Sequence, residues 1–343
     1  MPEPTIDYRS DLLVPPSPAI KAAVAEAMEM PPEFELRGGP YQAELERRTA
    51  DLLGKEDALL FPTCTMANQT ALILHCRPGD AIIAEQDAHI ITSEGGAPGS
   101  LAGATMLGVA GTNGLPDREV VARYINAPAN PIAPRVTALL LENTHLRSGG
   151  RVLDHDGSNK LSALAREAGI AVHLDGARLF NAAIATDKPL SELAAIADTV
   201  SLSLNKGLGA PFGAMLAGSK DLIDEALRVR HRLGGGFRPT AIVAAAAVAA
   251  LGSYDHIAED HRRARALATA LDALIGLSVA TVETNIVFVS LQNDTRVLVE
   301  ALDRQGVKVL PYGPNRIRLV THGGIGDDSV TRTVEAFKDI ATR

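Results

Sequence analysis

Short apolar runs recur through the middle of the chain, separated by segments in which apolar and polar residues alternate at helical spacing. A run that is apolar throughout is typical of a strand covered on both faces, as in a parallel sheet with helices on either side. We therefore predict strands at 58–62, 80–84, 136–142, 170–175, 199–204 and 214–218.

The intervening segments predict helices at 19–28, 41–53, 66–76 and 160–168. Strands that alternate with helices imply a mostly parallel sheet with right-handed crossovers. The expected fold class is α/β, with a large domain built on this sheet.

The last part of the chain has a different pattern. A long helix is predicted from Thr240 through His256 to Arg265. Further strands are expected at 279–282, 285–290, 307–310 and 316–321, and helices at 295–305 and 328–342. This order indicates a small C-terminal α+β domain.

Proline-rich breaks on both sides of the first helix mark the start of the chain as an arm. We expect an N-terminal arm at 1–40, a large cofactor-binding domain at 41–240 and the small domain at 241–343.

Composition narrows the class of protein. The 343 residues carry a net charge of −8, so no chain-wide basic surface favours nucleic acid or an anionic membrane. The two cysteines, Cys64 and Cys76, form neither a disulfide framework nor a CxxC metal spacing, and no metal is expected. No secretory signal is visible, and the apolar run at 241–251 is too short to span a bilayer. A cytoplasmic enzyme is expected.

Two motifs carry the chemistry: His173-Leu-Asp-Gly-Ala-Arg178 and Ser203-Leu-Asn-Lys-Gly-Leu-Gly209. Each alone could be structural, as a capping Asp175 and a surface Lys206. Together they place a carboxylate and an amine after buried strands, where α/β sheets bind ligands. Pyridoxal phosphate (PLP) needs this pair, because an amine forms a Schiff base with it and a carboxylate keeps its pyridine nitrogen protonated.

The same motifs resemble the threonine aldolases of the β-eliminating lyase group, which are PLP enzymes of the aspartate-aminotransferase-like fold. The similarity covers nearly the whole chain, in order. The other segments that carry it are Ile6-Asp-Tyr-Arg-Ser-Asp11, Phe61-Pro-Thr-Cys-Thr-Met-Ala-Asn-Gln69, Ala88-His-Ile90 with Glu94-Gly-Gly96, Leu141-Glu-Asn-Thr-His145, Leu233-Gly-Gly-Gly-Phe-Arg238, Thr284-Asn-Ile-Val-Phe288 and Arg318-Leu-Val-Thr-His322.

The resemblance implies cofactor roles residue by residue. Lys206 would form the Schiff base, Asp175 would hold the pyridine nitrogen, and Arg178 would lie near the phenolic oxygen. The phosphate would bind where Thr63, Cys64 and Thr65 open a helix, although an ordinary helix cap is the structural alternative. His89 would stack on the ring, the alternative being a structural histidine at a strand end. Arg238 would reach the phosphate of a neighbouring subunit, which predicts a homodimer or homotetramer with shared active sites.

Substrate roles follow from the same resemblance. Arg318, with Ser10, would bind the carboxylate of an amino-acid substrate, because a guanidinium fork matches a carboxylate. Arg316 shares the same strand face and is the alternative. His89 is the first candidate for the base that accepts the β-hydroxyl proton, and His145 is the second.

The expected reaction is cleavage of the Cα–Cβ bond of a β-hydroxy-α-amino acid. The alternatives are a β-eliminating or β-replacing lyase, a transaldolase-like enzyme of specialised metabolism, and a PLP-binding protein without activity. Two departures from the family bear on this choice: the segment 30–41 replaces an acidic family loop, and Leu146-Arg147 replaces a polar neighbour. A third, Cys64 in place of a glycine, concerns the phosphate site.

Overall fold

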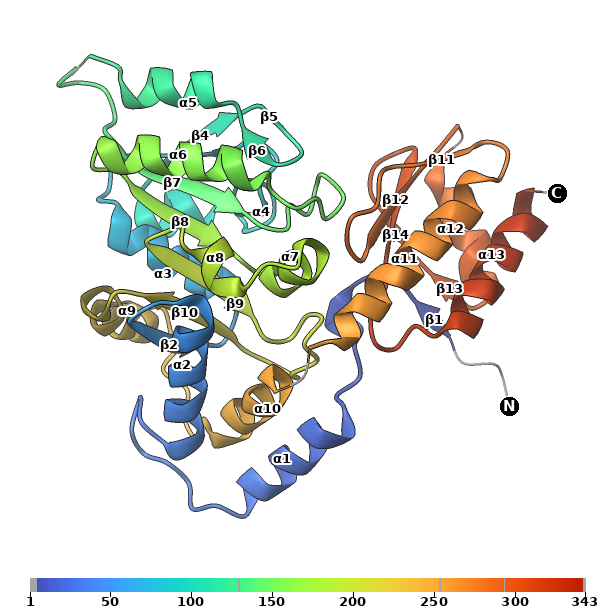
Figure 1. Ribbon diagram of the computed structural model, residues 1–343, viewed down its shortest axis with the longest axis horizontal. Coiled ribbons are helices and arrows are strands. Elements are labelled where there is room, and N and C mark those ends of the chain that lie inside the picture. Colours follow the sequence, from blue (N-terminus) through green and yellow to red (C-terminus); the bar gives the residue numbers. More distant parts are fainter. Residues whose placement is uncertain (1–4, 129, 253, 293, 342–343) are drawn as a thin grey trace.

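The computed structural model describes residues 5–128, 130–252, 254–292 and 294–341. The chain forms two bodies, a larger one around a seven-stranded sheet and a smaller one around a four-stranded sheet (Figure 1). This is the α/β class predicted from the sequence.

The large sheet has the strand order β2-β10-β9-β8-β7-β3-β4. Strand β10 runs opposite to the other six strands, so the prediction of a mostly parallel sheet is confirmed. The strands are β2 (Asp57–Phe61), β3 (Ala81–Glu85), β4 (Thr105–Val109), β7 (Val136–Glu142), β8 (Ala171–Asp175), β9 (Thr199–Ser203) and β10 (Ala214–Gly218). The edge strand β4 was not predicted, because its residues are partly exposed and lack a continuous apolar run.

Helices cover both faces of this sheet, which explains the uninterrupted apolar strands. Leu60 packs into the core on one face, and its neighbour Leu59 packs into the core on the other. The surrounding elements are α2 (Pro40–Leu53), α3 (Cys64–His75), α4 (His89–Thr92), η2 (Pro98–Ala102), β5 (Gly111–Thr112), β6 (Leu115–Pro116), α5 (Arg118–Ile125), α6 (His155–Glu167), α7 (Leu179–Thr186), α8 (Leu190–Ala194) and α9 (Lys220–Arg232).

The small sheet is antiparallel, in the order β11-β12-β15-β14. Its elements are α11 (His256–Asp272), β11 (Leu277–Val279), β12 (Ile286–Leu291), α12 (Thr295–Arg304), β13 (Val307–Lys308), β14 (Leu310–Pro311), β15 (Arg316–Val320) and α13 (Asp327–Ala341). The strand predicted at 279–282 is therefore wrong in position, and the one at 307–310 is two short strands.

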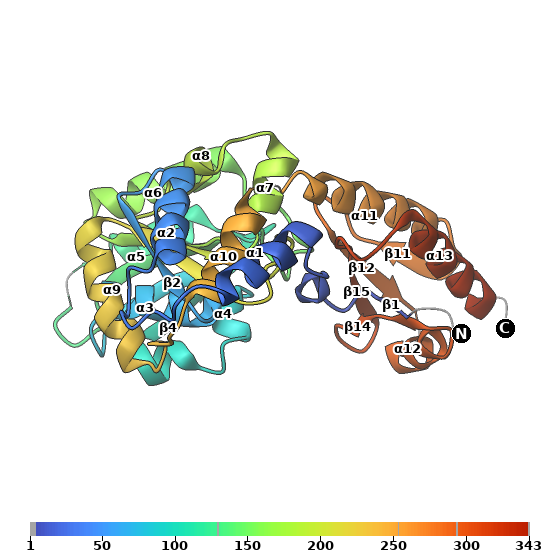
Figure 2. The same cartoon turned by 90° about the horizontal axis from the view of Figure 1, so that it is seen from below.

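The N-terminal segment joins the two bodies. Its strand β1 (Ile6–Asp7) pairs in parallel with β13 of the small body. The turn η1 (Asp11–Leu13) follows, and α1 (Pro18–Met28) then packs against α10 (Ala241–Leu251) on the large body, as Figures 1 and 2 show. Ser10 and Asp11 are thereby held between the two bodies.

The single long helix predicted from Thr240 to Arg265 is wrong. Helix α10 ends at Leu251, and α11 starts at His256 with a bend of 69°. The physical reason is that the two halves join different cores, α10 the core of the large sheet and α11 that of the small sheet, and that Gly252 is a poor helix former. The predicted division at residues 40 and 240 stays a prediction, and the packing of α10 favours a boundary after Leu251.

No single described helix is long and apolar enough to cross a membrane, although α10 and α11 pass that test as a bent pair.

Candidate active site

Three of the predicted cofactor residues lie at the carboxyl ends of strands in the large sheet. Asp175 is the last residue of β8, beside Glu142 at the end of β7, a residue to which the sequence assigned no role. Lys206 follows β9, and Thr63 follows β2 and caps α3. This is the edge of an open α/β sheet at which ligands bind.

Asp175 is buried and held by two donors. Its Oδ1 accepts the Ala177 backbone N–H at 3.0 Å, and its Oδ2 accepts Asn68 Nδ2 at 2.9 Å. Burial opposes ionisation of Asp175, but the nearby His89 and Lys206 outweigh it, and the pKa of Asp175 is lowered. The group is a fixed carboxylate that can hold a proton on a pyridine nitrogen.

Lys206 has the environment of a nucleophilic amine. Burial lowers the pKa of its ammonium group, and the positive charge of Arg178 lowers it further, whereas Cys64, Asp11 and Asp175 oppose the shift. A lowered pKa increases the fraction of neutral amine available for Schiff-base chemistry.

Arg178 forms a buried ion pair that sequence reasoning missed. Its Nε and Nη2 donate to Asp11 Oδ2 and Oδ1, both at 2.8 Å, and Asn285 Nδ2 donates to Asp11 at 3.3 Å. Burial alone would raise the pKa of Asp11, but Arg178 more than compensates and the pKa is lowered. The only sequence signal was that Asp11 ends the Ile6-to-Asp11 segment that carries the family resemblance.

His89 is oriented by two carboxylates. Its backbone N–H donates to Glu142 at 2.6 Å, and its Nδ1 lies 3.1 Å from Oε1 of the buried Glu94. A carboxylate only accepts, so the His89 proton lies on Nδ1 and the neutral ring offers its Nε2 lone pair. Burial would lower the pKa of His89, but Glu94 and Asp175 outweigh it and the pKa is raised. Glu94 was quoted in the resemblance, but no role was assigned to it.

His145 is fully buried, with a carboxylate near one ring nitrogen and a hydrogen-bond partner at the other. Its Nε2 lies 3.1 Å from Glu85, and its Nδ1 lies 2.8 Å from Ser148 Oγ. Burial lowers the pKa of His145, but the nearby carboxylates Glu85 and Glu142 raise it above its usual value. This arrangement favours His89 over His145 as the base.

The start of α3 combines a cap with a helix N-terminus. Thr63 Oγ1 accepts the Met66 N–H at 3.1 Å, so the capping alternative describes Thr63 itself. Cys64 and Thr65 are the first residues of the helix, and Cys64 does not have the positive φ that would require glycine. Burial, with Asp175, raises the pKa of the Cys64 thiol to about 12, so it is neutral beside Lys206. Phosphate binding at Thr63, Cys64 and Thr65 stays a prediction.

Arg318 is buried on β15 and points toward the arm. Its Nη2 donates to the Arg9 carbonyl at 2.9 Å, while its Nε has no hydrogen-bond partner among the described residues. Arg316 instead stacks on the ring of Phe288 at 4.5 Å. Ser10, next to Arg9, accepts the Leu12 N–H at 3.2 Å. The partly unpaired Arg318 thus fits a carboxylate better than Arg316.

Arg238 is exposed, and the contacts described for it are with Phe34 rather than with Asp175 or Lys206. It donates to the Phe34 carbonyl at 3.0 Å and lies over the Phe34 ring, so it is held by the altered 30–41 segment. Its role toward a second subunit stays a prediction.

The departure at Leu146 has a packing explanation. Its side chain is buried against Ile286, Phe288 and Val320 of the small sheet. Arg147 donates to Thr92 Oγ1 at 2.9 Å. Leu146 therefore forms an apolar contact between the two bodies, at the position where the resemblance led us to expect a polar residue.

The chemistry of the donor set fits PLP. A buried lysine with a lowered pKa, a fixed carboxylate and the N-terminus of a long helix lie at one edge of the sheet. One ligand atom each of His89, Glu94 and Asp175 also lies within 4.8 Å of the others, as in a metal site. Asn68 bridges the two carboxylates by hydrogen bonds, and the absence of a metal stays a prediction.

A model of the beta-eliminating lyase family matches residues 7–294. The chain belongs to this family. It is 35% identical to a low-specificity L-threonine aldolase of Arabidopsis thaliana over 97% of this chain and 96% of that protein. It is 33% identical to the low specificity L-threonine aldolase of Escherichia coli strain K12, over 98% of this chain and 100% of that protein.

Among solved structures, the fold matches a Leishmania major threonine aldolase with a TM-score of 0.86, at 21% identity, over 98% of this chain and 99% of the other. As a member of the beta-eliminating lyase family, the chain is a PLP-dependent lyase.

Proposed function

We propose that this lyase cleaves threonine or allo-threonine to glycine and acetaldehyde, in the cytoplasm. The observation that carries the proposal is the His89–Glu94 pair beside Asp175 and Lys206, because it adds an oriented base to a PLP site. An aldolase needs such a base for the β-hydroxyl proton. The relatives that bear the threonine aldolase name support the choice of substrate.

PLP, when bound, supplies an electron sink for the pair of electrons released by the breaking Cα–Cβ bond. The residues of the chain do the rest. Asp175 would hold the ring nitrogen of the cofactor, and Lys206 would supply the amine that binds the cofactor and that can later carry protons. His89 Nε2 accepts the β-hydroxyl proton, and Arg318 fixes the substrate carboxylate.

The test is a product assay. The PLP-loaded protein is incubated with β-hydroxy amino acids of both configurations at Cα and Cβ, and glycine and aldehyde are measured. Equal amounts of both products support the proposal. Turnover without glycine would indicate a β-eliminating or β-replacing lyase, and no turnover on any amino acid would indicate a PLP-binding protein.

Replacing His89 by asparagine should lower kcat by about 10²–10⁴-fold, the usual contribution of a general base. In the parent enzyme the base must be neutral, and Glu94 and Asp175 raise the pKa of His89. Activity should therefore fall as the pH drops, with the midpoint above the usual histidine value of about 6.5. A kcat–pH profile checks both points, and an unchanged acid limb in His89→Asn would transfer the role to another group.

Arg318→Lys keeps the charge but loses the planar fork. We expect KM for the amino acid to rise by about 10–100-fold, as for a lost charged hydrogen bond, with PLP affinity nearly unchanged. Arg316→Lys is the matched control, since its guanidinium stacks on Phe288. If the control raises KM and Arg318→Lys does not, Arg316 binds the carboxylate.

We further propose that two or four copies of the chain share their active sites, with Arg238 serving the neighbouring subunit. Its exposure and its contacts with Phe34 of the 30–41 segment support this. Sedimentation at micromolar concentration should give a dimer or tetramer, and dilution should weaken PLP binding and activity together. A fully active monomer would contradict the arrangement.

A further inference from the structure

Asn68 lies between the two carboxylates that the proposed reaction uses. From α3, its Nδ2 donates to Glu94 Oε1 and to Asp175 Oδ2, each at 2.9 Å. Its Oδ1 accepts Ser201 Oγ at 2.6 Å and lies 3.1 Å from His173 Nε2. All five side chains are buried, so their polar atoms depend on hydrogen-bond partners inside the protein.

The two carboxylates fix the orientation of the amide. A carboxylate only accepts hydrogen bonds, so the NH₂ group of Asn68 must face Glu94 and Asp175, and its oxygen must face His173. His173 must then carry its proton on Nε2. Burial lowers the pKa of His173 to about 4, so the ring is neutral and its Nδ1 accepts.

The same donor-to-acceptor order continues through the hydrogen bonds that lead away from the site. His173 Nδ1 lies 3.0 Å from Thr199 Oγ1, so the Thr199 hydroxyl must donate to it. That hydroxyl oxygen then accepts from His75 Nε2 at 2.8 Å. Burial lowers the pKa of His75, so its ring is neutral at neutral pH. The bond to Thr199 places the His75 proton on Nε2.

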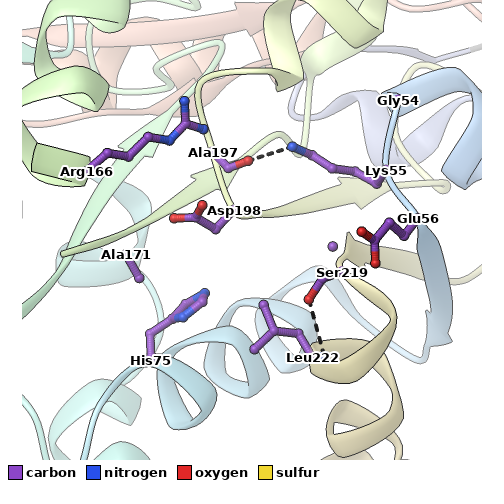
Figure 3. A pocket seen from close by; sticks show the side chains of 11 residues that line it. Gly54, Lys55, Glu56, His75, Arg166, Ala171, Ala197, Asp198, Ser219 and Leu222 are labelled. Carbon is purple, nitrogen blue, oxygen red and sulfur yellow. Dashed lines mark hydrogen bonds between the residues drawn. The ribbon is translucent and has the colours of Figure 1, made fainter. Parts of the chain in front are cut away.

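His75 is the outer end of this chain of donors. It lines an open pocket of about 490 Å³ together with Lys55 and Asp198 (Figure 3). The pocket lies at the amino ends of β8 and β9, whereas Asp175 ends β8. The hydrogen bonds thus run from one end of the sheet to the other, and all of them point toward Asp175.

We propose that Asn68 is a positioning residue for the two carboxylates Asp175 and Glu94. His173, Thr199 and His75 hold the orientation of its amide. The inference rests on the proposed function for the roles of Asp175 and His89. The donor to Asp175 stabilises the carboxylate charge that would hold a protonated cofactor nitrogen. The donor to Glu94 keeps that carboxylate in place to hold His89 Nδ1–H.

This row of hydrogen bonds orients and polarises the groups in it, but it does not conduct protons. An amide transfers a proton only by passing through its unstable imidic form, so Asn68 interrupts any relay. Aligned donors strengthen one another in a buried setting, and reversing one of them would leave the others unpaired. The consequence is a single allowed set of tautomers.

That set is measurable without cofactor or activity. In the cofactor-free protein with ¹⁵N-labelled histidine, His173 and His75 should both give the nitrogen shifts of neutral Nε2–H tautomers at neutral pH. An Nδ1–H tautomer or a charged ring at His173 would overturn the proposal. Assignment uses His173→Gln and His75→Gln to identify each lost signal.

A matched pair of variants tests the link to the site. Asn68→Leu removes the donors to both carboxylates, whereas Gln69→Leu removes only a donor to Glu94, at 2.7 Å. We expect Asn68→Leu to weaken PLP binding by about tenfold, as for one lost hydrogen bond to a charged group, and to change the absorption spectrum of bound PLP. Gln69→Leu should leave PLP binding and the PLP spectrum unchanged. It should shift only the acid limb of the kcat–pH profile, which we assign to His89.

Equal changes in the two variants would overturn the proposal. If Asn68→Leu does not fold, Thr199→Val replaces it, with Thr49→Val as the control that loses one buried hydroxyl bond elsewhere. Thr199→Val should shift the His173 nitrogen signals and the PLP spectrum, and Thr49→Val neither. The tautomers can hold even if no glycine is formed, so failure of the aldolase proposal is distinguishable from failure of this one.

Discussion

Replacing Lys206 by alanine should lower kcat by at least about 10⁴-fold, because the same amine serves as the nucleophile and later as a proton carrier. The structure gives the reason for its reactivity. Burial and the neighbouring Arg178 lower the pKa of Lys206, so a larger fraction of its amine is neutral than in an exposed lysine. PLP should still bind to Lys206→Ala, but without a covalent bond.

Borohydride reduction of the PLP-loaded parent enzyme, followed by peptide mapping, identifies the lysine directly. Lys55 is the control, since burial lowers its pKa as well but it lies at the opposite end of the sheet and donates to the Ala197 carbonyl. The pyridoxyl group should be on Lys206 and not on Lys55. Its recovery from any other lysine would refute the assignment.

Replacing Asp11 by asparagine should lower the free energy of unfolding by about 3–5 kcal/mol, because it leaves the Arg178 charge buried without its partner. The pair is bidentate and almost completely shielded from water. It also ties the arm to the large body, so the variant should lose PLP affinity in parallel. Urea unfolding of the two proteins at neutral pH measures the difference.

The pH dependence of this loss has a defined sign. Arg178 holds the pKa of Asp11 below its usual value, so the ion pair stabilises the fold above the unfolded pKa of about 3.9. The stability difference between parent and variant should stay constant above about pH 5 and shrink only at lower pH.

Asp7→Asn on the same arm is the control for Asp11→Asn. It breaks a solvent-exposed pair with Arg9 and should cost less than about 1 kcal/mol. Equal losses in the two variants would show that the buried pair contributes no more to the free energy of unfolding than the exposed pair.

The sequence was sufficient for the features that depend on neighbouring residues. Continuous apolar runs specified the inner strands of the large sheet, because a strand covered on both faces cannot alternate. Asp175 and Lys206 could be predicted for the same reason, since Asp175 ends one such strand and Lys206 comes shortly after another. The edge strand β4 and the break at Gly252 were missed, because partial exposure and the choice between two cores leave no local pattern.

The partners of the site residues were decided only by the tertiary structure. Asp11 and Arg178 are far apart in the chain, as are Asn68 and Asp175, and each pair meets because separate elements pack around one sheet edge. A buried charge or amide must find a partner wherever the fold brings one, and no local spacing encodes that choice. The sequence by itself therefore determined the fold class, and it predicted the two groups that PLP chemistry requires. Packing decided which side chains orient them, because those contacts exist only when distant segments are folded together.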